Sequence, residues 1–369
     1  MMPQPSDAVE QRSGVLHVFV AFDWGDEIKL AEARRLVQGV SHALPRRPRT
    51  PASIEYRPLP LRIALPPMRL EIPEIGKVNV DGELTLFDFG AVSVACQIPF
   101  SLSPAALARL AGLMALTTPV VATARQAIEP FYQKLLPAID DASWSELCEE
   151  YFVFQLEPWA AEPPPALRTG PSAAWLAGLV RLEPTAFSVD EQAEALRQHL
   201  SYTPDDLFVA DWPAAVLIDR DCEETLEVIE FANLQLLEYR HIDQRVDDNL
   251  VTAANLLHNL RQSALPFWRT HAKPMRILGD LRMEANGLFE RTGNVLKLVG
   301  DQYLARVYRL LERRFHLTRW ETNIARKLEV LDETYRTLAD QGATFRAEFL
   351  EWVIILLIMV EVVMSLLKH

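Results

Sequence analysis

The segment that most constrains this chain is FLEWVIILLIMVEVVMSLL, residues 349–367, where sixteen of nineteen residues are apolar. As a helix it would extend about 28 Å, close to the ~30 Å hydrocarbon core of a bilayer. Residues 353–360 carry no polar side chain on any helical face, whereas a soluble helix normally shows a polar stripe. We therefore expect a C-terminal transmembrane helix over 349–367. The alternative is a helix buried in the core of a soluble oligomer.

The energetics of insertion are favourable but include one anomaly. Thirteen residues of the segment are Leu, Ile, Phe or Val, which together contribute roughly −4 to −8 kcal/mol to insertion. A charge at the centre costs about +2.5 to +3.5 kcal/mol on the same scale, and a glutamate at 361 lies near the middle. A glutamate within a span usually faces a partner helix, which favours self-association. The predicted membrane anchor, a tail anchor, comprises Trp352, Ile354, Leu357, Met359 and Glu361.

The overall charge limits the class of partner. Fifty acidic residues against 37 basic ones give a net charge of −13, which argues against broad nucleic-acid binding because that needs clustered Lys and Arg. Two short basic runs, 45–49 and 313–319, are predicted to be an exposed loop and the solvated face of a helix. We expect the partners to be a membrane, further copies of this chain and an unknown protein, and no nucleic acid.

The cysteines and the N-terminus indicate the compartment. Cys96, Cys148 and Cys222 lie far apart, without the spacing of metal ligands, and three cannot all pair within one chain. This usage fits a reducing compartment. The N-terminus has no charged-then-apolar signal pattern. We therefore expect the protein at the cytoplasmic membrane, with the bulk of the chain facing the cytoplasm.

The first part of the chain alternates strand and helix patterns. Residues 1–13 are predicted to be a disordered tail and 14–221 an α+β domain. Its clearest element is a hairpin over 83–100 that turns at Asp88 to Gly90, and a helix opens at Pro104 with Ser103 as N-cap. Short apolar pieces within 45–73 suit edge strands or extended linkers. The other predicted elements are strands at 15–22 and 151–158, helices at 25–37, 172–182 and 189–200, and two strands within 205–219 joined at Trp212–Pro213.

The pattern becomes helical at Cys222, and residues 222–348 are predicted to be a helical coiled-coil region. From Ile229 to Leu260 apolar residues alternate at spacings of three and four, and a similar seam runs from Leu328 into the apolar segment. A helix between them is predicted from Pro274 towards His316, with a bend at Gly287 or Gly293. The predicted fold class is therefore α+β: an N-terminal mixed α/β domain, a long α-helical hairpin or coiled coil, and a C-terminal transmembrane helix.

One seam position is polar. Asp243 occupies it, and a single polar residue at such a site often fixes register or oligomer state. Either Asp243 forms an ion pair with a basic residue of the last helix, such as Arg326 or Lys327, or the helix rotates there and exposes it. The sequence leaves both alternatives open.

Signatures of enzymes are missing from the sequence. There is no G-x-S-x-G, no glycine-rich phosphate loop and no H-E-x-x-H. Glu238 with His241, and Glu312 with His316, are incomplete against the ligand set of a di-iron bundle. We predict no catalytic, cofactor-binding or metal-ligating residue. An alternative enzyme, a hydrolase or nucleotide-binding protein, would use Asp88, Asp211 or Asp219.

The long helices resemble a known family. IEFANLQLLEYRHIDQRVDDNL (229–250), the stretch 294–338 and FLEWVIILLIMVEVV (349–363) resemble the "required for meiotic nuclear division" family, as do ELTLFDFGAVSV and DDLFVADWPAAVLID. It is a family with a domain of unknown function, whose mitochondrial members are linked to translation and the inner membrane. This chain is similar to a bacterial-type member. The resemblance implies a C-terminal membrane segment after a coiled coil, and no catalytic residues.

The stretches that match best are 300–308 and 350–352. They add Tyr303 and Arg306 to Asp243 and Glu361 as candidates for fixing register or oligomer state. The function expected is a non-enzymatic, membrane-anchored oligomeric scaffold or adaptor with a cytoplasmic α+β domain, linked through the resemblance to translation or membrane organisation. The enzyme above and a soluble helical oligomer are the alternatives.

Overall fold

The computed structural model divides the chain into two compact units. The first combines Met1–Glu238 with Thr292–Thr318, and the second combines Tyr239–Arg291 with Arg319–His369. The residues that the structure describes are 11–37, 58–116, 119–158, 163–219, 222–262, 277–280, 282–283, 285–290 and 302–367.

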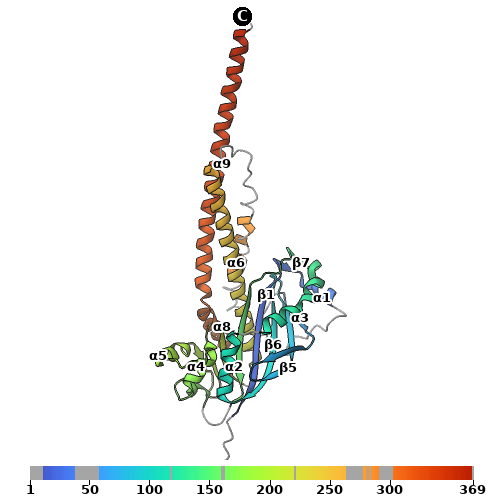
Figure 1. Ribbon diagram of the computed structural model, residues 1–369, viewed down its shortest axis with the longest axis vertical. Helices are drawn as coiled ribbons and strands as arrows, with labels where there is room; N and C mark the ends of the chain where they lie inside the picture. Colours follow the sequence, from blue (N-terminus) through green and yellow to red (C-terminus); the bar gives the residue numbers. More distant parts are fainter. Residues whose placement is uncertain are drawn as a thin grey trace, which may run out of the picture. The chain divides into compact units, whose positions relative to one another are not determined.

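A mixed sheet forms the centre of the first unit (Figure 1). Strands β8 and β11 are parallel, and every other described pairing is antiparallel. A second, small sheet pairs β2 (Glu27–Ile28) with β7 (Ile139–Asp140). The order of the large sheet is β3 (Leu61–Ala64), β5 (Gly76–Leu86), β6 (Ala91–Leu102), β1 (Arg12–Asp23), β8 (Cys148–Leu156), β11 (Ala214–Ile218), β10 (Leu207–Ala210) and β9 (His199–Leu200), with β4 (Met68–Ile72) also on β5.

The predicted hairpin is confirmed as β5 and β6, which pair from Asp81↔Gln97 to Leu86↔Val92. Its turn requires glycine at position 90, because Gly90 has φ +90° and a Cβ there would collide with the carbonyl oxygen of Gly25. The short pieces of the Pro-rich stretch are β3 and β4, strands at the edge of the sheet. The predicted tail was too long: β1 begins at Arg12, and residues 1–10 lie outside the described part.

Both faces of the sheet are largely buried over β1, β8, β10 and β11, because helices cover them there. Strand β4 and parts of β5 and β6 instead alternate buried and exposed side chains. Side chains of β1 such as Val18 and Phe22 pack in the main core with α1 (Leu30–Val37), α2 (Pro104–Leu116), α3 (Pro119–Leu135) and α4 (Ala173–Arg181). The opposite face, with Phe19 and Tyr151, is buried as well. It is covered by the first part of α6 (Glu223–Gln262), up to Glu238, and by α8 (Gln302–Arg314). The unit is therefore a helix–sheet–helix sandwich.

Several helix boundaries differ from the prediction. The helix expected at 25–37 begins at Leu30, because β2 occupies the residues before it. The helix expected at 189–200 is α5 (Val189–Ala195), since His199 and Leu200 form β9 instead. Helix α3, which contains Pro130, was not predicted. Ser103 does cap α2, because its Oγ accepts the backbone N–H of Ala106 at 3.2 Å. Two 3₁₀ turns, Leu136–Ala138 and Pro164–Arg168, complete the described elements.

The second unit pairs the rest of α6 with α9 (Leu317–Leu367), and Figure 1 shows the two helices running side by side in the same direction. Where their side chains are described, most residues of the predicted seams are buried, for example Val246 on α6 and Leu331 on α9. Tyr239 stacks on Phe289 with ring centroids 6.1 Å apart, so the helical residues around 285–290 also pack here. The middle helix predicted from Pro274 to His316 is only partly described: Gly287 is helical, and Gly293 lies outside the described residues.

Candidate functional site

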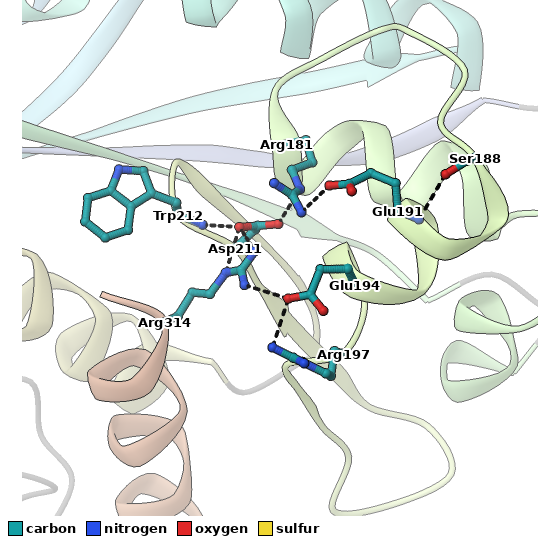
Figure 2. A network of polar contacts seen from close by, with 8 residues as sticks. All are labelled: Arg181, Ser188, Glu191, Glu194, Arg197, Asp211, Trp212 and Arg314. Carbon is teal, nitrogen blue, oxygen red and sulfur yellow. Dashed lines mark hydrogen bonds and ion pairs between the residues drawn. The ribbon is translucent and has the colours of Figure 1, made fainter. Parts of the chain in front are cut away.

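A buried carboxylate at the turn between β10 and β11 organises a network of polar contacts that joins three segments of the chain (Figure 2). Asp211 is fully buried. Its Oδ1 accepts hydrogen bonds from the backbone N–H of Trp212 and from Nε of Arg314, the latter at 2.7 Å. Its Oδ2 lies 2.7 Å from Nε of Arg181. Two arginines, from α8 and α4, thus neutralise one buried acid.

The network continues to α5 and becomes electrically balanced. Arg181 also pairs with Glu191 at 2.7 Å. Nη1 of Arg314 lies 3.7 Å from Oε1 of Glu194, and that oxygen pairs with Arg197 at 2.9 Å. Figure 2 shows these side chains converging on the turn from three separate segments of the chain. Three arginines face three carboxylates, so no net charge is left for a ligand to neutralise.

Aromatic packing surrounds the same turn. The hydroxyl of Tyr151 donates to the carbonyl oxygen of Asp211 at 2.9 Å. Burial, together with the negative charge of Asp211, raises the pKa of Tyr151 well above its usual value. The ring of Phe315 packs edge-on against Tyr151 and Trp212, at 5.2 and 6.1 Å between centroids. The turn therefore holds the C-terminal end of α8 against the sheet.

This arrangement suits a structural role better than a catalytic one. We call Asp211 and the groups that hold it, from Arg181, Arg314, Trp212 and Phe315, the clasp. A catalytic carboxylate must be reached by substrate, and both oxygens of Asp211 already contact arginines. The structure also separates the three acids proposed for an enzyme. Asp219 lies at the far end of β11, about 16 Å along the strand, and Asp88 lies at the β5–β6 turn, about 19 Å or more across the intervening strands.

No group of three or more His, Cys, Asp or Glu that could hold a metal occurs among the described residues. Burial first, and then the charge of Arg245, lower the pKa of His241 to about 4. Burial raises the pKa of the Cys96 thiol to about 12. Cys222 is buried too and Cys148 is half-buried, and none of the three cysteines forms a disulfide.

The polar seam position forms an ion pair, one of the two alternatives that the sequence left open. Nζ of Lys327 on α9 donates to Asp243 at 2.7 Å and to Asp247 at 2.8 Å. Burial alone would lower the pKa of Lys327, but the two carboxylates outweigh it and the pKa is raised. Whether this contact sets register or oligomer state stays a prediction.

The other candidates have different surroundings. Tyr303 is half-buried and packs against Tyr202 at 5.8 Å, and Arg306 is exposed on α8. Trp352 and Glu361 lie in α9, but their side chains are outside the described set. Ile354, Leu357 and Met359 are between 55% and 61% exposed.

The sequence did not predict the partners of Asp211. Arg314 belongs to the basic run 313–319 that was expected to be solvated, yet its side chain is only 13% exposed because it reaches Asp211. A basic residue at the end of an amphipathic helix was the available signal, but its partner is 103 residues earlier. Arg181, Glu191, Glu194 and Arg197 were missed for the same reason.

A search of the described residues for membrane spans finds no single helix that is long and apolar enough. Two helical stretches joined at a bend, Pro104–Met114 and Pro119–Ala138, together have the length and apolar composition of a membrane span. Buried side chains of both helices, such as Leu107 and Ile128, belong to the main core, which is the ordinary explanation for such a pair.

Residues 13–224, more than half of the chain, match the model of a protein family described as "Uncharacterized protein MJ0711, N-terminal domain". The chain belongs to this family. The match runs from β1 to the start of α6 and so includes Asp211 and Arg181 but not Arg314. A family of unknown function was expected, and its description carries no link to meiosis or mitochondria.

A relative from Methanocaldococcus jannaschii, "Uncharacterized protein MJ0711", is 27% identical over 177 residues. That alignment covers 47% of this chain and 53% of the relative, so the chain spans about half the length of the curated relative that it matches. No solved structure matches.

Proposed function

We propose that this protein is a non-enzymatic scaffold that the end of α9 anchors in a membrane. The observation that carries the proposal is the exposure of seven successive large apolar side chains, Ile354–Val360, each between 49% and 61% exposed. Proteins in water rarely expose an apolar patch of this extent. Because seven successive residues cover every face of a helix, lipid on all sides accounts for the exposure better than one packed partner does.

The proposed span is the whole segment 349–367, of which the structure describes only some side chains. Leu357 lies near its centre, and after Glu361 the sequence is apolar again from Val362 to Leu367 except for Ser365. The similarity of the long helices to the "required for meiotic nuclear division" family supports the same anchoring, because that family implies a membrane segment after a coiled coil. Self-association through Glu361, a location at the cytoplasmic membrane and a role in translation or membrane organisation are parts of this proposal.

The scaffold role draws on the first unit. Its central strands are buried on both faces, and the most buried acid of the described residues, Asp211, is neutralised by arginines. Such a site can hold the unit rigid, and both oxygens of Asp211 already contact arginines. We infer that the unit presents a surface to a protein partner while α9 holds it at the membrane.

Carbonate extraction of membranes tests the anchoring. The full chain should stay in the membrane pellet, whereas a truncation to residues 1–345 should be released. Replacing Leu357 with Arg should also release the chain in part, because a central charge costs about 2.5–3.5 kcal/mol of insertion. Val330→Arg is the matched control, since Val330 is a 50% exposed apolar residue of the same helix. Release of the full chain as readily as the truncation would refute the proposal.

A further inference from the structure

The outer face of α8 carries a stripe of arginines. Arg306, Arg309 and Arg313 are all exposed, while Leu304, Val307 and Leu311 on the other side of the helix are buried. At 100° per residue the three arginines fall within an arc of about 60° and span about 10 Å along the axis. We call these three residues the α8 arginine stripe.

The stripe is not neutralised within the described part of the chain. Arg314, at the end of the same helix, pairs with Asp211 and Glu194, but none of the three stripe residues forms an ion pair with another described residue. This local positive charge contrasts with the net charge of −13 of the whole chain.

Exposed aromatic side chains lie beside both ends of α8. Tyr202 is 73% exposed and packs against Tyr303 near the first turn. Trp212 is 42% exposed and packs against Phe315, one residue after the last turn. Tyr, Trp and Arg are the residues most enriched in the energetically important parts of protein interfaces.

From these observations we propose that the α8 arginine stripe, with Tyr202, is the docking surface for an acidic segment of another protein. The inference deepens the scaffold function proposed above by naming the chemistry of its partner. Guanidinium groups hold carboxylates through paired N–H donors, and a helix with acidic residues three or four apart would match the spacing of the stripe.

A protein fits better than a nucleic acid. Burial is the main cause of the raised pKa of Tyr303 at the start of α8, and the negative charges of Asp206 and Asp219 nearby raise it further. Glu312 is half-exposed at the end of the helix. Asp206 is buried, whereas Asp219 is half-exposed too, so that Asp219 and Glu312 place negative charge near the two ends of the stripe. A phosphate backbone needs a continuous basic track, whereas separate carboxylates on a peptide need only separate arginines.

Fluorescence anisotropy with the full chain in detergent micelles tests the proposal. The probe is a labelled helical peptide with glutamates three and four residues apart, and the same peptide with glutamine is its control. The glutamate peptide should bind, more weakly at higher salt, and the glutamine peptide should not. The stripe variant, which combines Arg306→Glu, Arg309→Glu and Arg313→Glu in one chain, should bind the glutamate peptide at least about tenfold more weakly.

The matched control is Arg34→Glu with Arg35→Glu, a pair of exposed arginines on α1 of the same unit, and it should leave the affinity almost unchanged. Tyr202→Ala should weaken binding without unfolding the unit, because that side chain is largely exposed. Three results would overturn the proposal: no binding of the glutamate peptide, an equal loss in the α1 control, or tighter binding of poly(U) RNA than of the peptide. Carbonate extraction of the stripe variant is independent of this readout, so a failure of docking is distinguishable from a failure of anchoring.

Discussion

At the scale of single residues, Asp211 decides how the first unit closes. A buried acid is stable only when its charge is compensated, and here Arg314 and Arg181 do so from two different helices. The backbone N–H of Trp212 and the packing of Phe315 complete the clasp. The cost of burial is offset only while all partners are present, so the turn and the end of α8 form one unit of stability.

We expect Asp211→Asn to destabilise the protein by about 3 kcal/mol, because it leaves two arginines facing a neutral side chain in a buried site. Denaturant unfolding followed by tryptophan fluorescence measures the change. Asp190→Asn, an exposed acid in the first turn of α5, should cost less than about 0.5 kcal/mol. Equal effects of the two substitutions would show that Asp211 is not a clasp.

The three cysteines should differ in reactivity. Burial raises the pKa of Cys96 to about 12, and Cys222 is only 5% exposed, so a thiol reagent at neutral pH should modify Cys148 first. Mass spectrometry of the partly modified protein locates the label. Cys148→Ser should abolish the fast phase. Rapid labelling of Cys96 in folded protein would contradict the packing of β6.

The residues of the clasp show where sequence reasoning ends. Trp212–Pro213 marked the turn, because strand patterns on both sides of a proline predict one. The polar residue before it gave no indication of burial. Charge pairs between elements depend on which helix reaches which strand, and no local pattern encodes the contact between Asp211 and Arg314.

At the scale of elements, the pairing of α6 with α9 combines a buried apolar seam with charged contacts. Lys327 of α9 joins two carboxylates of α6. Asp332 of α9 pairs instead with Arg282, which lies beyond the end of α6, at 3.3 Å, and with Arg336 of its own helix at 2.9 Å. Apolar seams alone allow a pair of helices to slip by a turn, whereas specific ion pairs penalise the slipped arrangement.

Lys327→Met should therefore lower stability by about 1–2 kcal/mol, because Asp243 loses its half-buried partner. Asp243→Asn should cost a similar amount, and the double variant should cost less than the sum, since both remove the same contact. Arg326→Met, an exposed neighbour on α9, is the control. Additive losses in the double variant would mean that the two side chains do not interact.

The pH dependence of unfolding should report on His241. Its pKa of about 4 in the folded protein lies below the usual value of 6.5, so the unfolded chain binds the proton more readily. The contribution of neutral His241 to the free energy of unfolding is fully present above pH 6.5 and is lost as the pH falls towards 4. The difference between the two values corresponds to at most about 3 kcal/mol. Denaturant unfolding at several pH values measures how the free energy of unfolding changes with pH. His241→Gln should reduce this change.

Elements with strong local patterns could be predicted, and those that depend on distant contacts could not. The hairpin at Asp88–Gly90 follows from its glycine and flanking β-rich runs, and the seams follow from their spacing. Helix α3 was missed because Pro130 breaks the usual signal and the buried face of the helix decides its formation. The end of α5 was misplaced because His199 and Leu200 pair with β10, a contact that no helix pattern anticipates.

At the scale of the whole molecule, the family match and the two units describe different parts of the chain. The matched region ends at residue 224, so the helices that form the second unit lie beyond it, and the exposed apolar end of α9 belongs to this second unit. The central claim is that lipid surrounds that end while the first unit recruits a partner. The sequence predicted the apolar run. The arginine stripe of α8 could be identified only from the structure, which shows which side of this helix is exposed.

Quenching by lipids tests this claim most directly. In the Cys148→Ser background, an environment-sensitive fluorophore is attached to a cysteine at position 357, and the protein is reconstituted into vesicles whose acyl chains carry bromine. The control places the same label at position 330, an exposed site on the same helix. We predict strong quenching and a blue-shifted emission at 357 and neither at 330. Equal, weak quenching at both positions, with emission typical of water, would contradict the account.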